Sequence, residues 1–230
     1  MRGALQLDGV LAVDVRPGQR DFTATYDPRT ASVAQMLAAL HAAREPAEFV
    51  FPPGAHDVDY VVAVDRVQAE RPSRLEHHAR IAPADELGTP LCLRGRLFDA
   101  DGETPVADAV VFAYHTDREG RYDRPGSGPH SWRLRGWART DAQGSFAFDT
   151  IRPGAYPSRR EPAHVHFTVF TATGRFHAGV VQFADDPLVT AEHREAARRD
   201  GRFGAVRDVR KDGDAEHVEF ALRLDRTNRF

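Results

Sequence analysis

The sequence predicts a mainly β protein, in which a small α/β segment precedes an antiparallel β-sandwich. Two observations lead to this prediction. From about Thr89 onward, short apolar runs alternate with turns rich in Gly, Asp and Pro, which is the spacing typical of a sandwich. Before that point, two strand-like runs are followed by one helical stripe. We therefore divide the chain into a segment 1–50, a connector 51–88 and a sandwich domain 89–230.

The first segment is expected to contain two strands and a helix. Residues 9–15 alternate apolar and polar side chains, and residues 21–26 form a second such run beyond a turn at Pro17. An apolar stripe with the i, i+3, i+4, i+7 spacing of a helix then begins at Val33 and ends before Pro46. These elements indicate a compact α/β unit.

The strand–strand–helix order has a partial counterpart in a known fold. Gly-Val-x-x-Val-x-Val and Thr-Tyr-Asp-Pro, followed by a helix, resemble part of the ferredoxin-like heavy-metal-associated fold. The Met-x-Cys-x-x-Cys metal loop of that fold is missing, as is its first strand, so residues 1–7 would begin inside its first helix. We therefore expect the segment to serve packing or dimerisation rather than metal delivery.

The connector and the sandwich domain supply the remaining elements. Residues 60–65 are expected to form a strand, and residues 190–200 a short helix. Turn sequences such as Asp-Ala-Asp-Gly and Asp-Ala-Gln-Gly separate the apolar runs of the sandwich. The runs that predict strands are residues 91–97, 109–115, 137–140, 145–148, 164–171, 177–183 and 217–224.

Composition limits the classes of partner. Hydrophobic residues make up 41% of the chain, enough for a sizeable core, and the net charge of -3 gives no reason to expect nucleic acid or an anionic membrane as a partner. The single cysteine, Cys92, excludes an intrachain disulfide and any cysteine-based zinc or iron–sulfur site. No apolar run approaches the roughly 18–20 residues of a membrane span, and no signal-peptide pattern opens the chain. We expect a soluble, cytoplasmic protein.

Four side chains within 45 residues form a candidate metal site: Tyr122, Tyr156, His164 and His166. Each tyrosine follows a turn that contains glycine, and such a turn can hold a ligand rigidly. The histidines occupy alternate positions of one expected strand, so they share a face about 7 Å apart. Each residue taken alone also fits a packing or surface role. Together, two phenolates and two imidazoles suit a hard ion such as Fe(III) better than zinc or magnesium.

Four motifs surround these residues between Leu91 and Asp186. They are Leu-Arg-Gly-Arg-Leu-x-Asp-x-Asp-Gly-x-x-Pro-Val, Asp-x-x-Gly-x-Tyr, Arg-Gly-Trp-x-Arg-Thr-Asp-x-x-Gly-x-Phe-x-Phe-x-Thr-Ile-x-Pro-Gly-x-Tyr-Pro and Pro-Ala-His-Val-His-Phe. In these motifs the chain resembles the intradiol ring-cleavage dioxygenases, the family of protocatechuate 3,4-dioxygenase and catechol 1,2-dioxygenase. The long third motif is the most specific of the four.

The resemblance implies a site and a reaction. Tyr122, Tyr156, His164 and His166 would bind a non-haem Fe(III), and the enzyme would insert O2 into a catechol-type ring to give a muconate-type diacid. Both tyrosines would bind as phenolates, far below their ordinary pKa of about 10. Tyr156 would be released from the metal to accept a catechol proton. The resemblance also implies a homo-oligomer, a dimer or larger.

Two positions depart from the pattern of the family. Glu161 stands where the family usually has an arginine, so we assign the stabilisation of developing negative charge on the substrate to the adjacent Arg160. Val180 stands where the family usually has a glutamine in the following strand, and Gln182 is expected to face the opposite way. The carboxylate of Glu161 leads us to expect a substrate without a carboxylate, or one with an amino group.

Two other protein classes share parts of the pattern. Transthyretin-like binding modules, which are not enzymes, have a similar strand–turn motif but lack the tyrosines and histidines. Cupin-type metal enzymes use His-x-His, but they need a further carboxylate and histidine and neither tyrosine. Within the loop after Tyr122, His130 and Trp132 are candidates for lining a substrate pocket.

Overall fold

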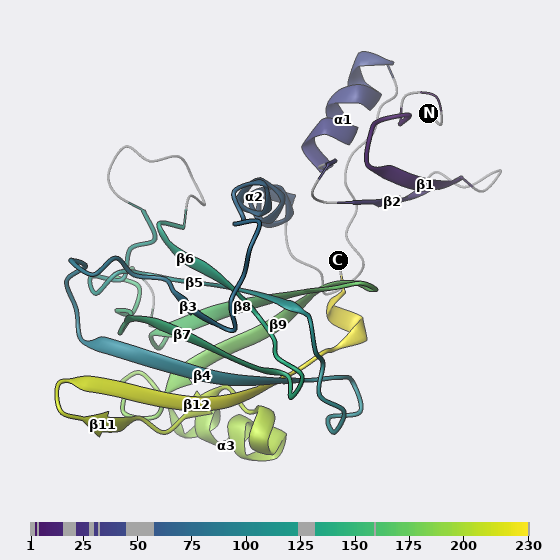
Figure 1. Cartoon of the computed structure of the whole chain (residues 1–230). Coiled ribbons are helices and arrows are strands. Elements are labelled where there is room, and N and C mark those ends of the chain that lie inside the picture. Colours follow the sequence, from purple (N-terminus) through teal and green to yellow (C-terminus); the bar gives the residue numbers. More distant parts are fainter. Residues whose placement is uncertain are drawn as a thin grey trace. The chain divides into compact units, whose positions relative to one another are not determined.

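The computed structural model describes residues 3, 5–15, 22–27, 30–31, 33–44, 58–123, 132–158 and 160–229. The chain divides into two compact units, Met1–Arg71 and Pro72–Phe230 (Figure 1). No helix of the described residues is long and apolar enough to cross a membrane.

The first unit contains the predicted hairpin and helix. Strand β1 (Val10–Val15) pairs antiparallel with β2 (Phe22–Tyr26), and helix α1 spans Val33–Ala42. The turn expected at Pro17 lies outside the described residues. Residues 5–9 contain turns and no helix, so the described structure adds nothing to the partial likeness to the ferredoxin-like fold, which stays a prediction.

Helix α2 (Val58–Ala69) occupies the place of the strand expected at residues 60–65, so that prediction is wrong. Its buried apolar residues have the i, i+3, i+4, i+7 spacing of a helix: Tyr60, Ala63, Val64 and Val67. The β-branched valines favour a strand locally, but this buried stripe decides for a helix. The Tyr26 hydroxyl donates a hydrogen bond of 3.1 Å to the Asp65 carboxylate, which joins β2 to α2.

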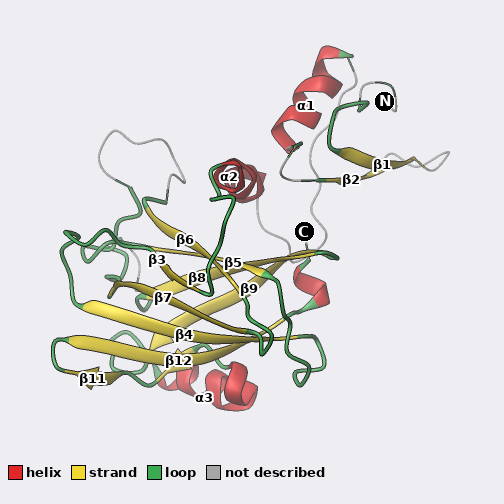
Figure 2. Ribbon diagram, in the orientation of Figure 1, coloured by secondary structure: helices red, strands yellow, loops and turns green. Residues whose placement is uncertain are grey.

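The second unit is a β-sandwich, which confirms the predicted fold class (Figure 2). Among the described residues, one sheet has the strand order β10-β9-β8-β5-β6 and the other the order β11-β12-β4-β7-β3. The first sheet consists of β10 (Val206–Arg207), β9 (Gly174–Phe183), β8 (His164–Thr171), β5 (Val110–His115) and β6 (Leu134–Arg139). The second consists of β11 (Arg210–Asp212), β12 (Ala215–Arg223), β4 (Pro90–Phe98), β7 (Ser145–Ile151) and β3 (His78–Arg80). The predicted helix is α3 (Ala191–Asp200), and single 3₁₀ turns follow at Gly201–Phe203 and Arg226–Asn228.

The sheets of the described residues are mixed rather than purely antiparallel, which corrects the sequence prediction. Strand β4 pairs antiparallel with β7, and β5 pairs antiparallel with both β6 and β8. The pairs β12–β4, β3–β7 and β10–β9 are parallel. The path through α3 between β9 and β10 permits the parallel direction of these two strands, because parallel neighbours need a long connection. The short strands β3, β10 and β11 were not predicted.

The hydrophobic core lies between the two sheets, and its composition orients β8. Val165 and Phe167 of this strand belong to the buried core cluster. Because successive side chains of a strand point to opposite faces, His164 and His166 point to the outer face of their sheet. The core therefore fixes the register that brings the two histidines together.

Candidate metal centre

Two turns carry the candidate tyrosines, and hydrogen bonds fasten these turns to each other. One turn precedes Tyr122 and the other precedes Tyr156. The Gly154 amide donates to the Asp117 carbonyl at 2.8 Å, and the Thr116 hydroxyl donates to the Gly154 carbonyl at 2.7 Å. The turns therefore form one paired support for the two tyrosines.

Glycine is required where the turns meet. Gly120 has a φ of +78°, which other residues rarely adopt, and a Cβ atom there would collide with the carbonyl of Ala155. A Cβ atom at Gly154 would likewise collide with the carbonyl of Arg118. The Gly-x-Tyr spacing of both motifs thus has a structural cause, since the close approach of the two backbones holds the tyrosines side by side.

The four candidate ligands meet at their donor atoms, and we call them the four-ligand cluster. The hydroxyls of Tyr122 and Tyr156 are in hydrogen-bond contact. The Tyr156 Oη lies 3.1 Å from His164 Nε2, which lies 2.9 Å from His166 Nε2. Two ligands about 2 Å from one shared ion, at right angles, lie about 3 Å apart. The spacing and chemistry of the donor set therefore fit a single hard metal ion.

The orientation of His164 supports a ligand role. Its Nδ1 lies 2.7 Å from the carbonyl oxygen of Pro162, and since a carbonyl only accepts, we infer that Nδ1 carries the proton. The lone pair of Nε2 then points into the cluster. The Asp186 carboxylate holds the residue before His164 in place, because it accepts the amide hydrogen of Ala163 at 2.9 Å. It also accepts the amide hydrogen of Leu188 at 2.8 Å. Metal-binding histidines usually have outer partners of this kind.

The tyrosines are what complete the donor set. Among the described residues, no group of three or more His, Cys, Asp or Glu side chains is arranged to hold a metal ion. His164 is buried, while His166 and both tyrosines are half-buried, so the cluster is reachable by a small molecule. A metal ion held here would need the phenol oxygens, which distinguishes the candidate site from zinc and calcium sites.

An aromatic stack backs the cluster, and sequence reasoning found only one of its members. The Tyr114 ring stacks on His166 with centroids 4.7 Å apart and on Trp132 with centroids 4.2 Å apart. Trp132, expected to line a pocket, is 2% exposed inside this stack, and His130 lies outside the described residues. The alternation of side chains along β5 is the signal that could have pointed to Tyr114. Tyr114 pairs with His166 of the neighbouring β8, so it faces away from the core as the histidines do.

The residues at the departures from the family pattern have distinct positions. Arg160 is exposed, and no hydrogen bond or ion pair within the described part of the chain joins it to the cluster. Gln182 is buried and pairs in register with His164, and Val180 pairs with His166. The expectation that Gln182 faces the opposite way is wrong, because residues two apart on a strand share a face.

His115 lies close in sequence to the Tyr122 turn but has a structural role. It is fully buried, with Nδ1 2.7 Å from the Thr116 carbonyl and Nε2 2.6 Å from the Thr150 hydroxyl. Burial lowers the pKa of this imidazole to about 4. A neutral His115 therefore joins β5 of one sheet to β7 of the other.

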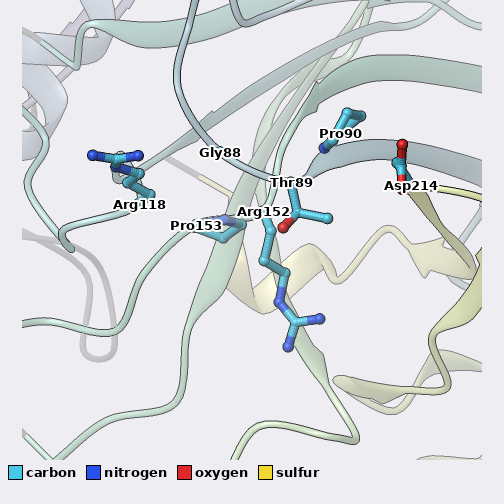
Figure 3. A pocket seen from close by; sticks show the side chains of 7 residues that line it. All are labelled: Gly88, Thr89, Pro90, Arg118, Arg152, Pro153 and Asp214. Carbon is cyan, nitrogen blue, oxygen red and sulfur yellow. The ribbon is translucent and has the colours of Figure 1, made fainter.

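A hollow of about 650 Å³ lies beside the paired turns, and none of the four candidate ligands lines it. Figure 3 shows the lining, where the guanidinium of Arg152 points away from that of Arg118. Arg152 binds the carboxylates of Asp185 at 2.7 Å and Glu216 at 2.8 Å and stacks over Phe183. With its charge already neutralised, Arg152 has a structural role, and we do not assign the hollow as the substrate site.

Comparison with known proteins decides the family. A family model described as a dioxygenase matches residues 65–226, more than half of the chain. The protocatechuate 3,4-dioxygenase alpha chain of Burkholderia cepacia is 32% identical over 154 residues, which are 58% of this chain and 77% of the relative. This chain belongs to the intradiol dioxygenase family. Members of this family use non-haem iron. Membership counts against both alternatives, the transthyretin-like module and the cupin-type enzyme.

Two further relatives define how far the likeness extends. The catechol 1,2-dioxygenase 2 of Acinetobacter lwoffii is 32% identical over 152 residues, which are 58% of this chain and 54% of the relative. The dioxygenase domain of a carbohydrate-binding fusion protein from Streptomyces sp. SirexAA-E has 25% identity and a TM-score of 0.50, and the match covers 78% of this chain and 97% of that domain. The chain spans about half the length of the catechol 1,2-dioxygenases that it matches.

Proposed function

We propose that the chain is a non-haem Fe(III) intradiol dioxygenase. The reaction inserts O2 into a catechol-type ring, opens the ring between the two hydroxyl-bearing carbons and gives a muconate-type diacid. The observation that carries the proposal is the convergence of two phenol oxygens and two imidazole nitrogens. Within this set, His164 Nε2 lies 3.1 Å from Tyr156 Oη and 2.9 Å from His166 Nε2. Family membership supports the same reaction class.

The four-ligand cluster would hold the iron. Two phenolates and two neutral imidazoles bring a charge of -2 to a ferric ion, which favours the ferric over the ferrous state. When bound, the ion supplies the Lewis acidity and the electron acceptance that make a catechol ring reactive toward O2. The hydrogen bond from His164 to Pro162 keeps the Nε2 lone pair free for the metal.

We assign the role of base to Tyr156. Its Oη lies between the Tyr122 hydroxyl and His164 Nε2, so it is the oxygen at the middle of the donor set. As a phenolate, it can accept the proton of an incoming catechol hydroxyl at Oη and become a neutral phenol. Its ring lies edge-on to the His164 imidazole, with an angle of 89° between the planes, and this contact limits the directions in which the side chain can move.

The substrate is proposed to lack a ring carboxylate, or to carry an amino group. Glu161 is half-buried three residues before His164, the first residue of β8, so a negative charge lies near the segment that holds His164. A substrate carboxylate would be repelled there. Arg160 remains our candidate for stabilising negative charge that develops on the substrate, although its side chain is exposed. Turnover of catechol, an aminocatechol and protocatechuate, by the wild type and by Glu161→Arg, tests this: a clear wild-type preference for protocatechuate would refute it.

The central test of the proposed function is spectroscopic. Protein purified in air should contain one iron per chain by elemental analysis and be red, because phenolate-to-Fe(III) charge transfer absorbs visible light. Anaerobic titration with a panel of catechols should shift the visible band, and admission of O2 should yield a diacid product. A colourless protein without iron, even after reconstitution with ferric salt, would refute the proposal.

Two further properties are part of the proposal. The cytoplasm as the location comes from the sequence-based expectation of a soluble protein, and a homo-oligomer, a dimer or larger, comes from the resemblance to the family. Fractionation of the source cells and analytical ultracentrifugation of the purified chain would test them.

A further inference from the structure

An ion-pair cluster lies against the Tyr122 turn and has no part in the chemistry described above. The guanidinium of Arg133 reaches both carboxylate oxygens of Glu86, one of them at 2.8 Å, and lies 3.7 Å from the Asp117 carboxylate. The three side chains are only 23%, 12% and 16% exposed, respectively. They come from three separate segments: the connection between β3 and β4, the turn after β5, and the residue before β6. We call these three residues the Arg133 clamp.

The clamp binds the main chain on both sides of Tyr122. The Arg133 amide donates to the Tyr122 carbonyl at 3.1 Å. Before the tyrosine, the Asp117 carboxylate accepts the amide hydrogens of Glu119 at 3.0 Å and Arg121 at 2.9 Å. The turn that presents Tyr122 is therefore closed by Asp117 on one side and by Arg133 on the other.

The residue before Arg133, Trp132, acts on a histidine of the cluster. Trp132 stacks on Tyr114, and Tyr114 stacks on His166 with only 8° between the two ring planes. Trp132 has a φ of +41°, a strained conformation for a bulky residue, which persists only where the surroundings enforce it. The bidentate pair of Arg133 enforces it from one side, and the Arg135 guanidinium, which donates to the Trp132 carbonyl at 3.0 Å, enforces it from the other.

We propose that Arg133 is a positioning residue, which through Glu86 and Asp117 fixes Tyr122 and through Trp132 fixes the ring of His166. Two of the four candidate ligands are thereby set by one dipeptide, Trp132–Arg133. The proposal rests on the proposed function, since the ligand roles of Tyr122 and His166 belong to it.

A buried ion pair such as that of Arg133 is weak evidence for stability, because desolvation offsets most of its attraction. The planar guanidinium instead contributes geometry, through two parallel hydrogen bonds that an ammonium group cannot make.

The test compares conservative variants of the clamp with a matched ion pair at the far end of β6. Arg133→Lys keeps the charge and loses the bidentate geometry, and Glu86→Gln keeps the shape and loses the charge. Arg139 of β6 makes an ion pair with Asp108, and both side chains are more exposed than those of the clamp. Arg139→Lys and Asp108→Asn are therefore the controls. All variants are measured as full-length protein, and circular dichroism verifies that each is folded.

With iron bound, both clamp variants should retain close to one iron per chain, show a shifted visible band, and lose roughly 10-fold to 100-fold in kcat with little change in KM. The controls should match the wild type in all four measurements. Folded clamp variants with an unchanged band and an unchanged kcat would overturn the proposal and leave the clamp a purely structural ion pair.

A readout on iron-free protein separates this inference from the proposed function. After chelation, amide hydrogen exchange is followed by mass spectrometry in peptides that cover residues 117–123. The amides of Glu119 and Arg121 should exchange about 10-fold faster in the clamp variants than in the wild type and in the controls, because the turn opens more often. Equal exchange in all variants would overturn the positioning role. A wild type that binds no iron would refute the proposed function but leave this comparison valid.

Discussion

Tyr156 is the residue on which the proposed chemistry depends most. If its phenolate accepts the catechol proton, Tyr156→Phe should leave Tyr122, His164 and His166 to retain the iron while kcat falls at least about 100-fold, which is the low end for loss of a general base. Iron content, the visible spectrum and steady-state kinetics with catechol would measure this. Tyr26→Phe is the control, because it removes a tyrosine hydroxyl outside the candidate site. That hydroxyl lies in the first unit, where it contacts Asp65. Unchanged turnover of Tyr156→Phe would remove the base from our mechanism.

At the same scale, some residues of the site could be predicted and others could not. The strand period places His164 and His166 on one face, and the motifs around the two tyrosines indicate their turns. The clamp was not predictable, because Glu86 and Arg133 are 47 residues apart and belong to no motif. Long-range ion pairs between loops depend on the final packing, and a single sequence carries no period or spacing that reveals them.

At the scale of elements, the errors share a physical cause. The sequence predicts a strand in the place of helix α2, because its valines favour β structure locally, whereas burial of one helical stripe decides for the helix. The parallel pairing of β12 with β4 joins two strands that lie far apart in the sequence, and apolar runs do not encode such a pairing. The longer strands of the sandwich were predictable, since turn residues and alternation are local signals, but their order and direction are properties of the whole sheet.

The paired turns lead to a stability prediction. Gly120→Ala should lower the free energy of unfolding by about 3 kcal/mol, because it adds a positive-φ penalty to a collision with the carbonyl of Ala155. Gly213→Ala is the matched control: its φ is +61°, but no atom lies within 4 Å of the added Cβ, so only about 1 kcal/mol is expected. Urea unfolding of the iron-free proteins measures both. Equal losses at the two positions would show that the turns do not depend on their close approach.

The buried link between β5 and β7 should make the protein sensitive to acid. The pKa of His115 is lowered from 6.5 to about 4 by burial, so between these values the unfolded chain binds a proton that the folded chain excludes. This contribution to stability is fully present above pH 6.5 and is lost as pH falls to about 4, a loss of about 3 kcal/mol. Urea unfolding across this range, for the wild type and for His115→Gln, would measure it. A variant with the same pH dependence as the wild type would assign the sensitivity to other groups.

At the scale of the molecule, the second unit carries all the parts that the proposed function needs. The buried cluster between the sheets draws only on residues from Ile81 onward, and all four candidate ligands and the clamp lie in Pro72–Phe230. The first unit has its own contact between Tyr26 and Asp65 and a separate set of buried residues on its two helices. The placement of every candidate ligand in one unit leads to a prediction about the chain as a whole.

A chain shortened to Pro72–Phe230 should fold, bind one iron and show the visible band of the full-length protein. The physical reason is that this unit contains everything that sets the spacing of the donor atoms. These features are the core of the sandwich, the paired turns and the register of β8. Iron analysis, the visible spectrum and kinetics would compare the two proteins. A shortened chain that folds and binds iron but turns over catechol poorly would place a substrate contact in residues 1–71. One that fails to fold would show that the second unit depends on the first, and the division into independent domains would then be wrong.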